Sequence, residues 1–188
     1  MPPPNESQPA PKTARAGSPA AYSEPQFNGD AREFPFHFLP YPSQAFLDGS
    51  LAHLPWLQEL PDVLTTAMWS SWVELNPQTA ARLGIATGDT VEVASKDGKL
   101  QSPAVISPGI APNIIAMPMG QGHETFTRFA SGRGANPISI LAPTTESETG
   151  ALAWAATRVR VSKVQPSSKS KLILFAGSLR EHPEDIGR

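Results

Sequence analysis

The 188-residue chain contains no cysteine. This absence excludes disulfide bonds, thiolate nucleophiles, redox-active cysteine pairs and cysteine-held zinc or iron–sulfur sites within the chain. No apolar run approaches the roughly 18 residues that a membrane-spanning helix needs, so we expect no membrane span. The N-terminal sequence MPPPNESQPAP also lacks the basic and apolar regions of a signal peptide, so none is expected.

An excess of charge of one sign is also missing. Fifteen basic residues stand against seventeen acidic residues, which gives a net charge of −2. Binding to a nucleic acid through bulk positive charge is therefore excluded, and we expect no nucleic-acid partner. Glycine and proline are abundant instead, with 14 and 21 copies, so turns and loops must take up much of the chain.

The residue patterns of common catalytic sites are absent. No two of the four histidines share a helix at ligand spacing, and neither an HExxH nor a GxSxG motif occurs, so we expect no metal held by this chain itself. Glu146 and Glu148 lie close together, but their surroundings favour a solvated loop over an acid–base pair. These absences favour a binding module over a self-sufficient enzyme. The histidines are His37, His53, His123 and His182.

Composition divides the chain into four parts. Residues 1–30 are rich in Pro, Ser and Ala and are predicted to be a disordered arm or linker. Residues 31–62 are aromatic and broken by prolines, which favours an irregular segment that wraps a neighbouring surface or an exposed patch for another domain or subunit. Residues 63–164 have regular patterning, and residues 165–188 are expected to be a C-terminal tail with a small apolar patch at 172–175.

The regular part predicts several short strands and one small helix. Asn76 can cap the helix, Pro77 suits its first position and Gly84 can end it. Strands are predicted at residues 63–69, 90–95, 100–107 and 114–119 and around Val159 and Val161. No helix is long enough for a parallel sheet with helical crossovers. The pattern therefore predicts a mainly β protein with a closed barrel.

A glycine-rich loop follows the apolar strand at 114–119 and is the most unusual stretch of the sequence. Its glycines allow close backbone approach to a phosphate or a flat ring, and its polar side chains can recognise a polar ligand edge. A barrel connection whose histidine is satisfied by the backbone is the alternative interpretation. The residues in question are Gly120, Gln121, Gly122, His123, Gly132, Arg133 and Asn136.

The series of motifs across residues 60–164 resembles the molybdopterin dinucleotide-binding domain of the dimethyl-sulfoxide-reductase superfamily. The motifs are Glu74-Leu75-Asn76-Pro77, LGIATGDTVEV at 83–93, the turn at Pro108-Gly109 and the loop Gly120–His123. Residues 122–141 are most similar to polysulfide-reductase-like subunits and to the large subunit of alternative complex III. The resemblance implies a six-stranded double-psi β-barrel with short helices, flanked by irregular or disordered terminal segments.

The resemblance also implies contact with a molybdopterin guanine dinucleotide, with residues 54–62 near the cofactor. Asn76 has a second interpretation as a helix cap, and Arg133 as part of a salt bridge. The predicted cofactor-binding residues are Asn76, Gly120, Gln121, Gly122, His123, Gly132, Arg133 and Asn136.

The chain departs from the resembled family because it lacks the iron–sulfur domain and the domains that carry the metal ligand. We therefore expect a fragment, a split subunit or a degenerate relative that positions the cofactor and is not catalytic alone. The expected partners are the remaining catalytic-subunit domains, an iron–sulfur subunit and a membrane quinol-oxidising subunit, at the periplasmic face of a bacterial membrane.

Two alternatives remain open. One is a cofactor-free structural domain of a quinol-oxidising complex of the alternative complex III type, in which residues 34–56 and 172–175 dock onto neighbouring subunits. The other is a substrate-recognition barrel like the N-terminal domains of some ATPases, against which the GQGH loop and the missing ATPase motifs count.

Overall fold

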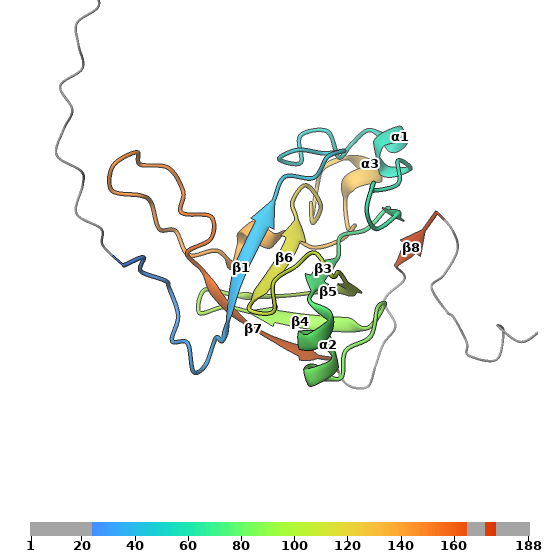
Figure 1. Ribbon diagram of the computed structural model, residues 1–188. Helices are drawn as coiled ribbons and strands as arrows, with labels where there is room; N and C mark the ends of the chain where they lie inside the picture. The colour runs from blue at the N-terminus through green and yellow to red at the C-terminus, as the bar shows by residue number, and fades with distance from the viewer. Residues whose placement is uncertain (1–23, 165–171, 176–188) are drawn as a thin grey trace, which may run out of the picture.

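A closed barrel of six strands forms the centre of the molecule, in the order β1-β6-β3-β5-β4-β7 (Figure 1). The computed structural model describes residues 24–164 and 172–175. The barrel strands are β1 (Phe36–Tyr41), β3 (Val73–Leu75), β4 (Thr90–Ala94), β5 (Lys99–Ile106), β6 (Ile114–Pro118) and β7 (Arg158–Lys163).

The strand pairing is mixed. Strand β1 runs parallel to β6, and β3 runs parallel to β5. The other four neighbouring pairs are antiparallel. The closed barrel leaves its six strands without a free edge, which removes the template for edge-to-edge association. The predicted fold class, a mainly β protein with a closed six-stranded barrel and short helices, is confirmed.

Helix α2 (Pro77–Leu83) forms where the cap signals predict it. The Asn76 side chain accepts a hydrogen bond from the Gln78 backbone N–H at 2.9 Å, and Pro77 occupies the first turn. Gly84 ends the helix with φ +65°, in the left-handed region where a residue without Cβ has no steric penalty.

The sequence-based strand predictions fail at two places. Residues 63–69 were predicted to be one strand, but only Ala67–Met68 (β2) has strand structure, and Thr66 and Trp69 have positive φ values. Strand β1 lies instead within residues 31–62, so the barrel extends N-terminal to residue 63. Proline and aromatic residues concealed the alternation of FHFLPY, whose Phe36 and Phe38 side chains face the core.

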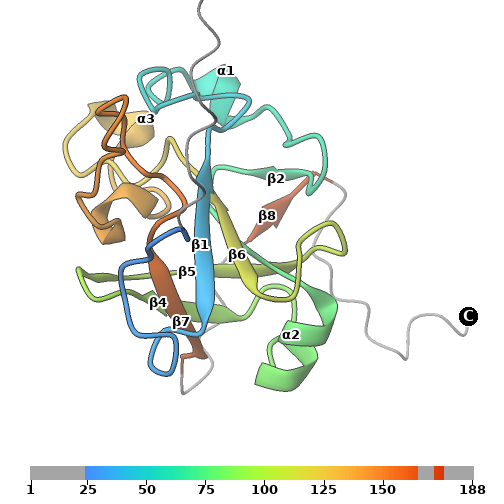
Figure 2. The ribbon, with the colours of Figure 1, turned by 60° about the vertical axis from the view of Figure 1, so that its left-hand side comes forward.

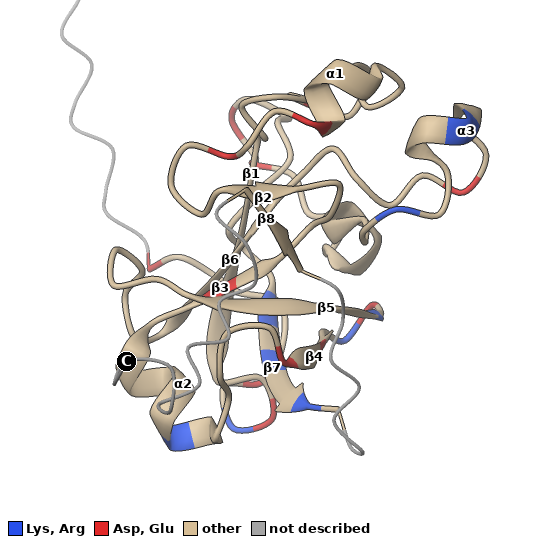
Figure 3. Cartoon of the chain, turned by 90° about the vertical axis from the view of Figure 1, so that its right-hand side faces the viewer, with Lys and Arg blue, Asp and Glu red and all other residues tan. Residues whose placement is uncertain are grey.

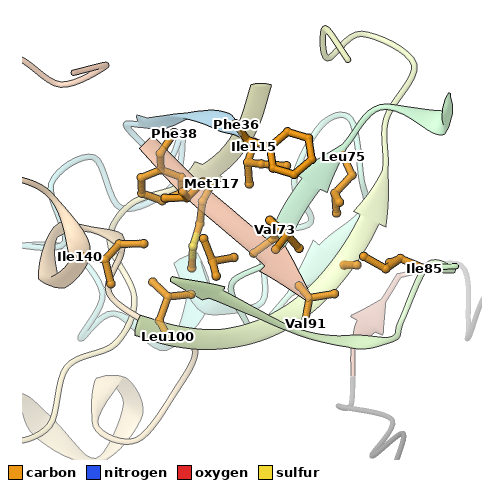
Figure 4. Packing of buried hydrophobic residues seen from close by; sticks show 14 of the residues in the cluster. Phe36, Phe38, Val73, Leu75, Ile85, Val91, Leu100, Ile115, Met117 and Ile140 are labelled. Carbon is orange, nitrogen blue, oxygen red and sulfur yellow. The ribbon is translucent and has the colours of Figure 1, made fainter. Parts of the chain in front are cut away.

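The core fills the barrel interior with side chains from all six strands (Figure 4). Phe36 and Phe38 of β1 lie beside Ile115 and Met117 of β6. The predicted wrapping segment therefore packs its buried aromatic residues onto its own barrel. The fully buried members are Phe38, Val73, Leu75, Ala80, Val91, Val93, Ala104, Ile115, Met117, Ile140 and Val159.

The short helices divide between the two ends of the barrel. Helices α1 (Pro55–Gln58) and α3 (Thr127–Ala130) lie at one end and α2 at the other, in both views (Figures 1 and 2). The 3-10 helix η1 (Pro137–Ile140) packs against β5. Within residues 24–164 and 172–175, no helix is long and apolar enough to cross a membrane. Lys and Arg residues are spread over α2, α3 and β7, with no single basic face in the view of Figure 3.

A two-stranded sheet flanks the barrel. Strand β8 (Ile173–Leu174) pairs antiparallel with β2, and Leu174 is buried against Ala67 and Trp72. At least this part of the predicted apolar tail patch is therefore covered by the chain itself. The rest of the predicted tail, residues 165–171 and 176–188, and residues 1–23 of the predicted arm lie outside the described residues.

Phe38 and Leu39 test the assignment of β1 to the barrel. Phe38 is fully buried, whereas its neighbour Leu39 is 38% exposed. We expect Phe38→Ala to lower the free energy of unfolding by about 3–5 kcal/mol, because a large cavity remains in the core. Leu39→Ala should cost less than about 1 kcal/mol. Urea denaturation measures both, with Phe38→Leu as a milder variant, and equal losses at the two positions would contradict the assignment.

Candidate functional site

The glycine-rich loop folds back on itself at the end of the barrel that carries α1 and α3. The Gly122 N–H donates to the Arg133 carbonyl, and the Gly132 N–H donates to the His123 carbonyl, both at 2.8 Å. The Ala135 N–H donates to Ser71 Oγ at 2.8 Å and ties the returning chain to the start of β3. The two halves of the predicted site, residues 120–123 and 132–136, therefore lie side by side.

Two glycines make this close approach possible. A Cβ on Gly122 would lie 2.2 Å from the Asn136 nitrogen, and one on Gly134 would lie 2.7 Å from Ser71 Oγ. Both residues have positive φ values, +89° and +61°. Gly132 also has a positive φ, +70°, but a Cβ there would meet nothing within 4 Å. Gly122 and Gly134 therefore shape the loop sterically, whereas Gly132 supplies only a backbone conformation.

A cavity of about 370 Å³ opens beside this loop. Its walls come from the segment after β1, the end of α1, the chain between β2 and β3, and the residues after β6. Of the predicted site residues, only Gln121 lines it. The lining side chains that matter most for the chemistry are Phe46, Gln58, Trp69, Trp72, Met119 and Gln121.

Arg133 lies over the Trp69 side chain, which lines the cavity. Its guanidinium carbon is 4.4 Å from the indole ring centre, within the range of a cation–π interaction. Its Nε donates to the Phe129 carbonyl at 2.7 Å, which fixes the plane of the guanidinium group. Among the described residues, no ion pair and no further hydrogen bond involves the Arg133 side chain, so the predicted salt-bridge alternative has no partner in this part of the chain.

Trp69 is itself held in an unusual backbone conformation. Its φ of +54° is rare for a bulky residue and costs on the order of 1–3 kcal/mol. The Trp69 N–H donates to the Gln58 carbonyl at 3.1 Å, which anchors the residue to the end of α1. Such strained residues concentrate at ligand sites, so the conformation marks this wall of the cavity as a candidate site feature.

A pair of buried amides forms another part of the cavity wall. Gln58 is fully buried and Gln121 is 5% exposed. The Gln121 Nε2 donates to Gln58 Oε1 at 2.7 Å, and the Gln58 Nε2 donates to the Ala52 carbonyl at 2.8 Å. The pair joins α1 to the glycine-rich loop. Its hydrogen bonds also satisfy groups that would be costly to bury alone.

His123 has a buried nitrogen without a hydrogen-bond partner. Its Nε2 is the one side-chain polar atom of this kind among the described residues. A Cβ on Gly49 would lie 3.0 Å from this nitrogen, and the Phe126 ring centre is 5.0 Å from the imidazole. Gly49 has no side chain, so the His123 imidazole can lie close to its backbone. The His123 Nε2 still has no hydrogen-bond partner among the described residues.

The two predicted asparagines serve as helix caps. Asn136 accepts from the Ile138 N–H at 3.0 Å at the start of η1. Asn76 caps α2 and also donates through Nδ2 to the Ile110 carbonyl at 2.6 Å. Because α2 lies at the other end of the barrel (Figure 2), the fold does not bring Asn76 to the glycine-rich loop.

Glu74 is a buried carboxylate that the sequence marked only as part of a motif. It accepts hydrogen bonds from the Tyr41 hydroxyl at 2.5 Å and from Trp72 Nε1 at 3.1 Å. Burial and the neighbouring Glu74 carboxylate raise the pKa of Tyr41 well above its ordinary value, so Tyr41 remains a donor. This network fixes the Trp72 indole at the cavity wall.

Sequence reasoning named neither Trp69, Trp72 nor Gln58 as a site residue. The one available signal was the resemblance of residues 54–62 to a segment near the cofactor, which includes Gln58. Within the described part of the chain, no group of three His, Cys, Asp or Glu side chains is placed to hold a metal ion.

The glycines give a matched pair of substitutions. We expect Gly132→Ala to cost about 1–2 kcal/mol, because its positive φ disfavours an L side chain but the space is open. Gly122→Ala should cost about 1–3 kcal/mol more, because its Cβ overlaps the Asn136 backbone. Thermal and urea unfolding of the two variants measure the difference. Equal destabilisation would contradict the close packing of the loop.

Comparisons with known proteins place these features in a family. Residues 60–154 match the molybdopterin dinucleotide-binding domain family. The chain is 38% identical over 92 residues to the menaquinone reductase, molybdopterin-binding-like subunit, of Nitratidesulfovibrio vulgaris (strain Hildenborough), which covers 49% of this chain and 13% of that subunit. It is 32% identical over 151 residues to the arsenate respiratory reductase molybdopterin-containing subunit ArrA of Shewanella sp. (strain ANA-3), covering 76% of this chain and 18% of that subunit.

A solved structure supports the fold independently. Acetylene hydratase from Pelobacter acetylenicus superposes with a TM-score of 0.60 at 15% identity, over 76% of this chain and 21% of that chain. The chain spans less than a fifth of the length of the two curated relatives. The resemblance drawn from the motifs is confirmed. The chain belongs to the molybdopterin dinucleotide-binding domain family and is a domain similar to part of the catalytic subunits of larger molybdopterin oxidoreductases.

Proposed function

We propose that this domain holds part of a molybdopterin guanine dinucleotide at the end of the barrel formed by the glycine-rich loop and the adjacent cavity. The observation that carries the proposal is the Arg133 guanidinium, which is fixed over Trp69 beside the cavity. Its Nη groups make no hydrogen bond or ion pair with another described residue. A positioned guanidinium with free donors suits bidentate binding of a phosphate.

The other residues of the site fit the same group. The Trp69 and Trp72 side chains and Met119 give the cavity an apolar wall for a flat heterocycle. The Gln121 carboxamide adds a polar edge at the cavity wall. This donor set recognises an organic anion and supplies no metal ligand cluster in the described part of the chain.

The contribution of this chain is positioning. A bound molybdopterin cofactor supplies the redox-active metal at which electrons or oxygen atoms are exchanged. Arg133 neutralises phosphate charge, and its anchoring to the Phe129 carbonyl limits the orientations of the bound group. The Gln58–Gln121 pair and the Glu74 network keep the cavity walls in place, so that little reorganisation is needed on binding.

The remaining parts of the enzyme are assigned by similarity. The relatives are named as subunits of reductases, and this chain spans less than a fifth of their length. The metal ligand and the iron–sulfur centres would come from other domains or from an iron–sulfur subunit. A membrane quinol-oxidising subunit and a location at the periplasmic face of a bacterial membrane complete the proposal, on the basis of the motif resemblance.

A second candidate function is a cofactor-free scaffold domain. It is favoured by the internal use of three predicted site residues. Asn76 and Asn136 cap helices, and Gln121 is paired with Gln58. In that case the glycine-rich loop packs α1 and α3 onto the barrel. Metal and pterin analysis of the native complex separates the two functions: guanine-bearing pterin at near-stoichiometric amount supports the cofactor site, and its absence from an active complex supports the scaffold.

Arg133 gives the sharpest test on the chain itself. Guanosine diphosphate is the probe, and its binding is measured by titration calorimetry. We expect Arg133→Ala to weaken binding by at least about tenfold, because a charge-assisted hydrogen-bond pair contributes about 1.5–3 kcal/mol. Guanosine, which has no phosphate, should bind both proteins equally.

Arg128→Ala is the matched control. Arg128 also lies over an aromatic ring, that of Phe129 at 4.5 Å, but Phe129 does not line the cavity, whereas the Trp69 ring under Arg133 does. This variant should retain wild-type affinity for guanosine diphosphate. A loss of affinity equal in the two variants, or no binding to the wild-type chain at millimolar probe, would favour the scaffold function.

A further inference from the structure

The segment that leads into the barrel is fastened across the start of β7. The Asn28 N–H donates to the Ala156 carbonyl at 2.7 Å, and the Arg158 N–H donates to the Asn28 carbonyl at 2.9 Å. The Phe27 ring meets the His37 imidazole edge-on, with 4.4 Å between the ring centres. The Arg158 guanidinium carbon lies 5.6 Å from the centre of the same phenyl ring. These contacts join the segment, β1 and β7 in one cluster.

The protonation state of His37 follows from one hydrogen bond in this cluster. Arg158 Nη1 lies 3.2 Å from His37 Nε2. An arginine side chain has donors and no acceptor, so the histidine nitrogen must be the acceptor. His37 therefore carries its proton on Nδ1 and is neutral. A proton added to Nε2 would place two N–H groups face to face and two cations side by side.

We propose that Phe27 and Asn28, together with His37 and Arg158, form a pH-sensitive latch that holds residues 24–35 on the barrel and releases them when His37 is protonated. The latch is independent of the proposed cofactor site, because none of its residues lines the cavity. Its release frees the chain that precedes β1 from the surface of β7. The six barrel strands stay paired.

The carboxylates around the latch have partners of their own, and none of these partners is the His37 imidazole. Glu33 forms an ion pair with Arg160 on β7 at 3.6 Å, so the two opposite charges act on the imidazole together and partly cancel. The Asp97 carboxylate accepts from the Asn28 side chain at 3.3 Å. Asp30 accepts from the Arg32 N–H at 2.8 Å.

On the β6 side the imidazole has neutral neighbours. The His37 backbone N–H donates to the Asn113 carbonyl, and its register partner is Ile114. No carboxylate among the described residues is hydrogen-bonded or ion-paired to the imidazole, and the one charged side chain in contact with it is Arg158.

The direction of the pH effect follows from this environment. Burial, followed by the Arg158 charge, lowers the pKa of His37 below its ordinary value of 6.5. A histidine with a lowered pKa binds its proton more weakly in the latched state than in the released state. The latch is therefore fully stable above pH 6.5 and loses stability as the pH falls through and below that value.

Hydrogen exchange of the full chain tests the latch. Protection of the Asn28 and Arg158 amides, corrected for intrinsic exchange, is compared at about pH 8 and about pH 5.5, on either side of an ordinary histidine pKa. We expect a several-fold loss of protection at the lower pH. The amides of β4 and β5 serve as the internal reference and should keep their protection.

Two histidine variants complete the test. His37→Gln has no proton to gain, so its protection at Asn28 and Arg158 should not change with pH. His53→Gln is the matched control, because His53 contacts the Ser50 carbonyl and lies outside the latch, and it should retain the wild-type pH response. The proposal is overturned if the wild-type chain shows no pH response, if His37→Gln retains it, or if the reference amides lose protection in parallel.

Discussion

The parallel pairing of β1 with β6 is the constraint on which the candidate site depends. Parallel neighbours leave the sheet at the same end, so the chain after Tyr41 and the chain after Pro118 emerge together. Gly120 then lies against Phe46, with its missing Cβ only 2.7 Å from the Phe46 Cβ. The cavity wall is assembled from these two exits, α1 and the chain that enters β3. An antiparallel pair would have sent the two segments to opposite ends of the barrel.

Around this junction, backbone groups and buried amides fix the walls before any ligand binds. The carbonyls of Arg133 and His123 are used to close the glycine-rich loop, and Gln121 is held by Gln58. Polar groups buried in this way are stable only because each finds a partner. Beside these satisfied groups, the Arg133 Nη donors have no partner among the described residues, and they mark where the proposed polar ligand would bind.

Much of the barrel could be predicted from local patterns, because its central elements have short, self-contained signals. The cap at Asn76, the stop at Gly84 and the alternation of 90–95 each act over a few residues, and the structure has α2 and β4 there. Strand β1 could not be predicted in this way. Its prolines and aromatic residues suit a strand only because β6 and β7 pair with it on both sides, and those partners lie far away in the sequence.

The site was harder to predict than the fold for the same physical reason. The loop glycines and Arg133 are adjacent in sequence, so their proximity was foreseeable, but Trp69 meets Arg133 only through the folded chain. Asn76 shows the converse difficulty. It belongs to the same series of sequence motifs as the glycine-rich loop, but it caps α2 at the other end of the barrel.

The two ends of the barrel differ in what their side chains do. At the α2 end, the Asn76 side chain caps α2 and donates to the Ile110 carbonyl, and the proposed latch at His37 holds the segment that leads into β1. At the α1 and α3 end, the strained Trp69 lines a cavity, the anchored Arg133 lies over its ring, and the adjacent loop contains the buried, unpartnered Nε2 of His123. A purely structural barrel would gain stability by relaxing Trp69 and satisfying His123. A group bound against Trp69, as proposed, would offset part of this cost, in keeping with the concentration of strained residues at ligand sites.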